Sequence, residues 1–201
     1  PDLAVEISLQ PWRRFGVDAV IVFSDILIPC EAMGQELYFD DKGPHLSPLI
    51  QTESALEKLA SLDVNNTRFL FDALSLLRKE LQNETALIGF CGSPWTTAAY
   101  MVGGGTSHGQ GQLKIQSFIQ KDAKFLHKLL EKVTESLIPY VKGQIESGVD
   151  LIQVFDTWGG SLNPEEYKVF GQPYIKQLIE GIKDKVPITL YCQNTGTLLE
   201  P

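Results

Sequence analysis

Hydrophobic residues gather in short runs along the chain, and each run ends on a polar or glycine-containing segment. The runs cover residues 19–24, 86–91, 148–155 and 186–192, and Val, Ile and Leu dominate them. Runs of this length and composition are typical of strands in a parallel sheet that is covered on both faces. The pattern therefore predicts four buried β-strands, of which the first ends at Asp25. Pro29 is expected to close off regular structure soon afterwards.

Between these runs, apolar residues recur at three- and four-residue spacing, which predicts amphipathic helices. The predicted helices cover about 52–60, 66–83, 113–141 with a break, and 164–183. A further helix is expected to begin at Pro94, because Ser93 is a suitable N-cap and proline suits the first helical position. Asn163 and Pro164 mark another start in the same way. Strand–helix–strand alternation favours parallel strands with right-handed crossovers, so the predicted fold class is α/β.

Polar side chains follow three of the predicted strands. Asp25 comes directly after the first strand, Tyr100 lies about two turns into the helix after the second, and Thr157 follows the third. In folds built from βα units, ligands bind and chemistry takes place at the carboxyl ends of the strands. Each residue also has a structural alternative. Asp25 could cap the next turn, Tyr100 could be a core residue with a bonded hydroxyl, and Thr157 could bond to its own turn.

Composition narrows the class of protein further. The chain has 201 residues, of which 43% are hydrophobic, and a net charge of −8, which argues against nucleic acid as the main partner. No apolar run approaches the roughly 18 residues that a membrane span requires, and no basic, apolar leader stands at the start. The 3 cysteines are scattered, which predicts a reducing compartment without a disulfide framework.

Several segments, in order along the chain, together resemble a known family. They are Leu9–Phe15, Phe23–Gly34, Leu87–Trp95 with Ala99–Val102, Val154–Gly160 and Phe170–Ile175. Phe-Ser-Asp-Ile-Leu in the second segment and Gly-Ser-Pro-Trp in the third are the most specific. Together these segments are similar to uroporphyrinogen decarboxylases over essentially the whole chain. The resemblance implies a partial (β/α)₈ TIM barrel in which the chain holds the second to fifth strands.

The resemblance also implies an activity. The family decarboxylates the four acetate side chains of uroporphyrinogen III to give coproporphyrinogen III, in porphyrin, heme and chlorophyll biosynthesis, without a cofactor or metal. Asp25 matches the catalytic aspartate that hydrogen-bonds the pyrrole N–H groups of the substrate. Tyr100, also assigned a catalytic role, and Thr157 match groups near substrate carboxylates.

Apolar residues complete the site that the resemblance implies. Ile21, Phe90 and Phe155 fall where the family lines its pocket, and apolar walls suit a flat macrocycle. The implied partners are a small-molecule tetrapyrrole and a second subunit in a homodimer, with no membrane or nucleic acid. The implied location is the cytoplasm or the plastid stroma. His45, His108 and His127 match nothing functional, and we predict that they are surface or loop residues.

Two departures from the family pattern qualify this interpretation. The arginine-rich motif that grips substrate carboxylates and a histidine near the substrate both lie outside these residues, so we expect an internal piece of the enzyme with both termini truncated. The segment from Tyr100 to Thr106 also lacks an acidic residue that the family usually has before the glycines. That difference predicts a shortened or reshaped loop.

Other functions are weighed against the same residues. A zinc methyltransferase on the same barrel would need a His-x-Cys pair at the fourth strand, where this chain has Leu190-Tyr191-Cys192 and no histidine. The glycines from Gly103 to Gly109 satisfy neither the dinucleotide nor the P-loop pattern. A non-catalytic porphyrin-binding relative and a scaffold remnant stay open, although a remnant would be expected to lose the polar residues at the strand ends.

Overall fold

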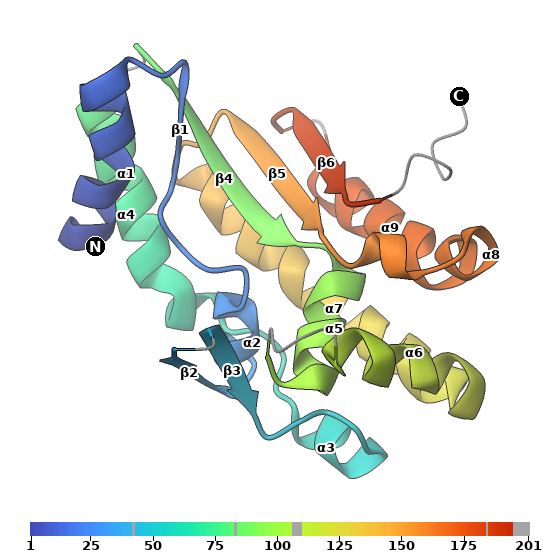
Figure 1. Cartoon of the computed structure of the whole chain (residues 1–201). Coiled ribbons are helices and arrows are strands. Elements are labelled where there is room, and N and C mark those ends of the chain that lie inside the picture. Colours follow the sequence, from blue (N-terminus) through green and yellow to red (C-terminus); the bar gives the residue numbers. More distant parts are fainter. Residues whose placement is uncertain (42, 83, 106–109, 184, 195–201) are drawn as a thin grey trace.

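The computed structural model contains a four-stranded parallel sheet with the strand order β1-β4-β5-β6 (Figure 1). The strands are β1 (Ala19–Ile21), β4 (Ala86–Gly92), β5 (Leu151–Asp156) and β6 (Ile188–Cys192). Ile21 pairs with Ile88, which in turn pairs with Leu151. The structure describes residues 1–41, 43–82, 84–105, 110–183 and 185–194. Parallel strands joined by helices confirm the predicted α/β class.

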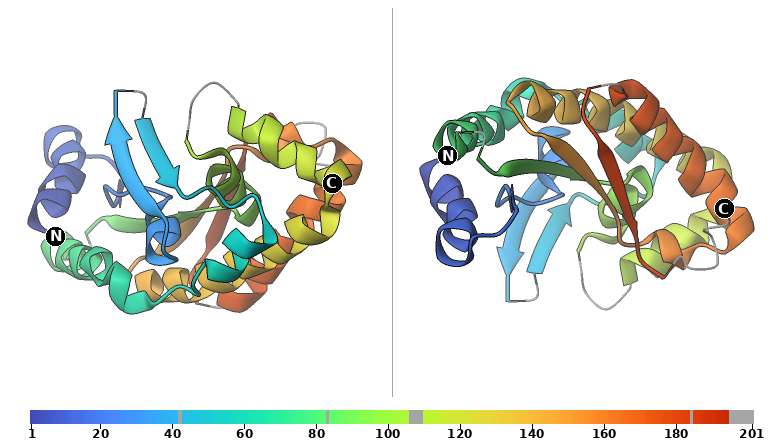
Figure 2. Two further views of the ribbon diagram at one scale, coloured as in Figure 1. Left: turned by 90° about the horizontal axis from the view of Figure 1, so that it is seen from below. Right: turned by 90° about the horizontal axis from the view of Figure 1, so that it is seen from above.

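Helices pack against one face of this curved sheet (Figure 2). The layer consists of α4 (Arg68–Leu81), α7 (Ala123–Glu146) and α9 (Gln172–Ile182), with α1 (Asp2–Phe15) beside α4. The remaining helices are α2 (Ile28–Ala32), α3 (Glu53–Lys58), α5 (Pro94–Gly103), α6 (Gln110–Lys121), α8 (Pro164–Glu166), the 3₁₀ turns η1 (Val64–Thr67) and η3 (Gly159–Ser161), and the π-helical η4 (Tyr167–Gly171). None of the helices in the described ranges is both long and apolar enough to cross a membrane.

Local sequence explains most of these boundaries. In α4 the buried residues Leu70, Leu74, Leu77 and Leu81 recur at three- and four-residue spacing and form one apolar face. The predicted break within 113–141 falls at Asp122, whose side chain accepts a hydrogen bond from the Phe125 N–H and caps α7. Both predicted helix caps, at residues 93 and 163, are present as well.

The two faces of the sheet differ in burial. Along β5, residues alternate between fully buried positions on the helix side and half-buried positions on the opposite side. On that opposite side Ile21 is 43% exposed and Tyr191 is 47% exposed. The prediction of strands covered on both faces was therefore wrong for these residues. The four described strands form an open curved sheet, and the helix layer covers only one side of it.

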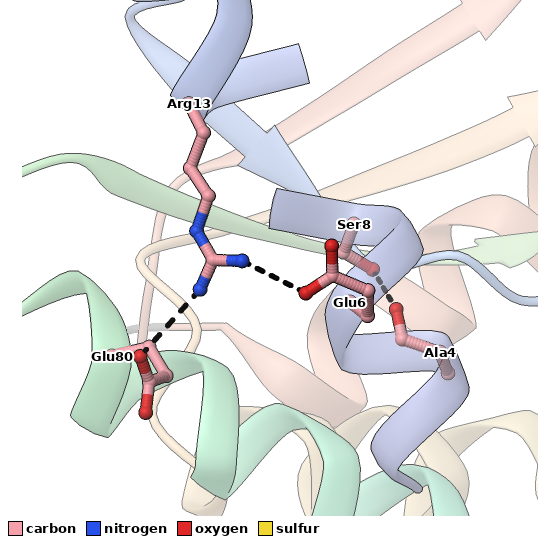
Figure 3. A network of polar contacts seen from close by, with 5 residues as sticks. All are labelled: Ala4, Glu6, Ser8, Arg13 and Glu80. Atoms are coloured by element: carbon pink, nitrogen blue, oxygen red, sulfur yellow. Dashed lines mark hydrogen bonds and ion pairs between the residues drawn. The ribbon is translucent and has the colours of Figure 1, made fainter. Parts of the chain in front are cut away.

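The first strand is shorter than predicted, because α1 takes over its hydrogen bonding. Regular pairing ends at Ile21, and the Phe23 N–H donates to Ser8 Oγ of α1 at 2.8 Å. Ser8 Oγ itself donates to the Ala4 carbonyl at 2.6 Å (Figure 3). In the same view Arg13 pairs with Glu6 at 2.8 Å and reaches Glu80 of α4 at 3.8 Å. These contacts hold α1 between β1 and α4.

A β-hairpin that the sequence did not predict lies beyond the strand ends (Figure 1). It consists of β2 (Glu36–Asp40) and β3 (Gly43–Ser47), which pair antiparallel. Its backbone joins the end of α5, because the Leu46 N–H donates to the Gly104 carbonyl at 2.8 Å and the Ile50 N–H donates to the Met101 carbonyl at 3.0 Å. Pro29 also differs from expectation: it occupies the first turn of α2 rather than ending regular structure.

A buried glutamine from α7 completes the hydrogen bonding of β4. Gln144 is fully buried, and its side-chain amide accepts from the Phe90 N–H and donates to the Phe90 carbonyl, both at 2.9 Å. Pairing between β1 and β4 stops at Ile88. Gln144 therefore supplies at Phe90 the two bonds that a longer β1 would have made.

We expect Gln144→Ala to lower the free energy of unfolding by about 2 kcal/mol or more. The substitution leaves a buried N–H and a buried carbonyl without partners, and each such group costs roughly 1–3 kcal/mol. Urea denaturation of the complete protein measures the change. Gln120→Ala is the matched control, because Gln120 is exposed on α6, and it is expected to stay within about 0.5 kcal/mol of the parent. Equal stability of both variants would contradict the role given to Gln144.

Candidate active site

The carboxyl ends of the strands meet at one edge of the sheet, beside α2 and α5 (Figure 1). Asp25 follows β1, α5 with Tyr100 follows β4, and Thr157 follows β5. The three polar residues selected from the sequence therefore belong to the same edge. Parallel strands bring this about, since all of their carboxyl ends point in one direction.

Aromatic side chains lie near this edge on the face of the sheet that the helices do not cover. The Phe90 and Phe155 rings meet edge to face with their centroids 5.7 Å apart, and Tyr191 continues the row at 6.3 Å from Phe155. Together with Ile21 and residues of α1, both phenylalanines line a cavity of about 490 Å³. The structure thus brings together the three apolar residues that the sequence selected. Flat apolar walls of this kind suit a ring-shaped ligand.

Asp25 lines a second cavity, of about 480 Å³, next to the first. Phe23 and Ser24 contribute to the lining of both cavities. One carboxylate oxygen of Asp25 accepts a hydrogen bond from the Leu27 N–H at 2.8 Å. The capping role that the sequence left open for Asp25 is therefore present, and the side chain also lines a cavity.

Tyr100 stands half-buried on α5, and its ring meets the Trp158 ring edge to face with the centroids 6.0 Å apart. Burial raises the pKa of the Tyr100 hydroxyl, and the negative charge of Asp25 adds to the effect, while the Trp158 side chain acts in the opposite direction. The hydroxyl therefore stays protonated at neutral pH and can donate a hydrogen bond. Asp25 lies within electrostatic reach of it.

Thr157 lines a third cavity, of about 340 Å³, which Asp25 does not line. Its other walls are Gln112, Trp158, Gly160, Ser161, Gln193 and Asn194. Hydroxyl and amide groups dominate this lining, and such groups can donate hydrogen bonds to an anion. The predicted site residues therefore do not share one cavity: Asp25, Thr157 and the apolar residues line three different ones, and Tyr100 lines none of these three.

Asp156, which ends β5, is a buried polar residue that sequence reasoning did not select. Burial raises the pKa of its carboxyl, and hydrogen bonds from Ser93, Thr96, Cys192 and Tyr167 oppose that effect. The sequence signal that could have identified Asp156 was its position directly after an apolar run. Asp25 has the same kind of position. Alternation along β5 also places it on the buried face with Ile152 and Val154.

The three cysteines are free thiols. Cys91 is fully buried, and burial raises the pKa of its thiol to about 12, while Cys30 is shifted in the same direction. Both are therefore protonated core residues rather than nucleophiles. Within the described ranges, the structure contains no group of three or more side chains that could hold a metal ion.

The histidines differ from their predicted placement at the surface or in loops. His45 lies half-buried in β3, 2.8 Å from the Asp40 carboxylate. His127 lies half-buried in α7, with its ring nitrogen 2.6 Å from the Tyr174 hydroxyl. Both histidines therefore lie in regular secondary structure, where each side chain has a polar partner. His108 lies outside the described residues.

Comparison with known proteins identifies the family. The profile described as "Uroporphyrinogen decarboxylase (URO-D)" matches residues 1–201. The chain belongs to the uroporphyrinogen decarboxylase family. Among named relatives, the uroporphyrinogen decarboxylase of Ruthia magnifica is 42% identical over all of this chain and 59% of its own length. That of Myxococcus xanthus is 43% identical over 95% of this chain and 55% of its own length. The chain thus spans somewhat more than half the length of these uroporphyrinogen decarboxylases.

Solved structures confirm the barrel type. A methyltransferase from Methanosarcina mazei matches 95% of this chain and 56% of its own, with a TM-score of 0.78 and 18% identity. A B12-independent methionine synthase from Shewanella matches 94% of this chain and 50% of its own, with a TM-score of 0.57 and 17% identity. At such identities the similarity shows the fold alone. The fold is a partial TIM barrel of the uroporphyrinogen decarboxylase family, unclosed in the described residues.

Proposed function

We propose that this chain contributes to a decarboxylase that converts uroporphyrinogen III to coproporphyrinogen III by removing acetate carboxyl groups as carbon dioxide. Family membership supports the reaction class. The observation that carries the proposal is the carboxylate of Asp25 at the carboxyl end of β1, directly after Ser24, which lines the apolar cavity on the open face of the sheet. Because the chain spans 55–59% of the length of the relatives named above, the activity is assigned to the complete protein.

The chemistry explains why a carboxylate is needed there. Protonation of a pyrrole ring turns the ring into an electron sink for the electrons of the breaking C–C bond. A fixed carboxylate beside the ring stabilises the positive charge that this protonation creates, and it acts most strongly where water is excluded. Asp25 supplies that charge in the proposal, and Phe90 and Phe155 exclude water from the face of the macrocycle.

Tyr100 and Thr157 bind substrate carboxylates in the proposal. A tyrosine whose pKa is raised keeps its proton and donates it in a hydrogen bond. Thr157 and the amides around it offer neutral donors, which hold an anion without an ion pair. The homodimer, the role in heme or chlorophyll biosynthesis and the cytoplasmic or plastid location, all expected from the family resemblance, remain predictions.

The direct test uses the complete coding sequence that contains these residues. The purified protein is incubated anaerobically with uroporphyrinogen III, and the products are oxidised and separated by chromatography. We expect stepwise loss of carboxyl groups that ends at coproporphyrinogen, with the same rate in the presence of a metal chelator. Binding without turnover would favour the non-catalytic relative, and a chelator-sensitive rate would contradict decarboxylation without a metal.

A further inference from the structure

The buried carboxylate of Asp156 joins the start of α5, η4 and the end of β6 to the end of β5. Asp156 has no exposed surface. One of its oxygens accepts hydrogen bonds from the hydroxyls of Ser93 and Thr96, at the start of α5. The other accepts from Tyr167 of η4 at 3.3 Å and from the Cys192 thiol, at the end of β6, at 3.4 Å. A carboxylate is the only side chain of this size that can accept from four donors at once.

Thr96 extends this network to the loop after β5. Its hydroxyl donates to Asp156 at 3.0 Å and accepts from the Trp158 N–H at 3.1 Å. The neighbouring Trp95 indole donates to the Trp158 carbonyl at 3.1 Å. Both backbone polar groups of Trp158 are therefore bonded to side chains of α5. These bonds connect a helix and a loop whose bonded residues Thr96 and Trp158 are 62 residues apart in sequence.

The connection runs directly to two residues of the proposed site. Tyr100 lies one helical turn beyond Thr96, so the two side chains share one face of α5. The Trp158 ring packs edge-on against the Tyr100 ring, and Thr157 immediately precedes Trp158. A shift of α5 against the loop would change the separation of Tyr100 and Thr157.

We infer that Asp156 is a positioning residue that fixes Tyr100 on α5 relative to Thr157 on the loop after β5. It acts through Thr96 and Trp158 and does not touch the substrate. This inference rests on the proposed function, in which Tyr100 and Thr157 bind carboxylates of one substrate molecule. It adds to that function a residue that fixes the relative positions of two binding groups from different βα units.

A double-mutant cycle on the complete protein tests the inference. We expect Asp156→Asn to lower kcat/KM for uroporphyrinogen about fivefold. Thr157→Val is measured in the parent and in the Asp156→Asn background. If Asp156 acts through the placement of Thr157, the loss from Thr157→Val is at least about threefold smaller in that background. Additive losses would overturn the inference, because they are what a general loss of stability produces.

Asp150→Asn is the matched control. Asp150 precedes β5 at the opposite end of the sheet, where its carboxylate accepts from the Leu87 N–H at 2.7 Å. It is expected to change stability and to combine additively with Thr157→Val. Thr96 gives a second pair of variants if Asp156→Asn does not fold. Thr96→Ser keeps the hydroxyl and is expected to retain activity, whereas Thr96→Val loses it; equal activity of the two would overturn the inference.

Hydrogen exchange separates this inference from the proposed function. In Asp156→Asn only one of the two side-chain oxygens remains to accept from the four donors, which weakens the network that holds Thr96, so the Trp158 amide is expected to exchange at least about tenfold faster. The Val154 amide inside β5 is expected to keep its protection. This readout needs no turnover, so it holds even if uroporphyrinogen is not the substrate. Unchanged exchange at Trp158 would overturn the positioning role.

Discussion

The Asp25→Asn variant of the complete protein is expected to keep its fold and to lose at least about tenfold in turnover of uroporphyrinogen. The asparagine carbonyl can still accept the Leu27 N–H that Asp25 now accepts, so the turn into α2 stays capped. Only the negative charge is removed. A tenfold loss corresponds to about 1.4 kcal/mol, a modest value for a charge interaction in the transition state.

Asp63→Asn provides the matched control for this variant. Asp63 caps η1 with the same geometry, because its carboxylate accepts from the backbone N–H two residues on at 2.9 Å. It is exposed and lines none of the three cavities described above. Asp63→Asn is expected to retain the parental rate. Parental turnover by Asp25→Asn would rule out the proposed role of Asp25.

The second expected result concerns the 201-residue chain expressed alone. We expect it to be oligomeric or poorly soluble and to decarboxylate no uroporphyrinogen. Within the part of the chain that the structure describes, β1 and β6 each pair with a neighbouring strand on one side only, and exposed sheet edges favour association. Ile21, Leu190 and Tyr191 add apolar surface that is 42–47% exposed.

Charge leads to the same expectation for activity. The chain carries a net charge of −8, and uroporphyrinogen, the proposed substrate, is itself a polyanion. The family resemblance implies that the arginine-rich motif lies outside these residues, so Asp25 would face substrate carboxylates without those cations, and like charges at short range repel. Light scattering after size-exclusion chromatography and the product assay measure both outcomes. A soluble monomer that turns over uroporphyrinogen would contradict this expectation.

The parts of the fold that were predicted correctly are those whose signals are local. The strand that begins at Ala86 and the helix capped by Ser93 follow from an apolar run, a cap and a proline. α1 was not predicted, because Pro11 lies inside it and lacks the N–H that an interior helical position needs. Its packing overrides that penalty, since Leu9 is buried and Ser8 bonds to Phe23.

The hairpin was missed for a related reason. β2 is largely exposed, and Pro44 in β3 has a low intrinsic propensity for strands. The structure accommodates both strands by joining β3 to the end of α5. That partner is more than 50 residues away, so no local pattern could have revealed it.

The candidate site was predicted unevenly in the same way. Ile21, Phe90 and Phe155 come together because strand alternation and register fix which face a side chain takes. Thr157 lies in a loop, where no regular repeat predicts the direction of a side chain from its position in the sequence. It lines a separate cavity. The functional roles of all these residues, including Asp25 and Tyr100, remain predictions.

The contact between the hairpin and the end of α5 explains why glycines stand at the end of that helix. Gly104 has a φ of +84°, and a side chain there would collide with Leu49, while one at Gly105 would collide with the Pro44 carbonyl. The absence of a side chain at both positions therefore permits the close approach of the end of α5 to the segment from Pro44 to Leu49. A larger residue at either position would therefore force the hairpin or Leu49 to move away from the end of α5.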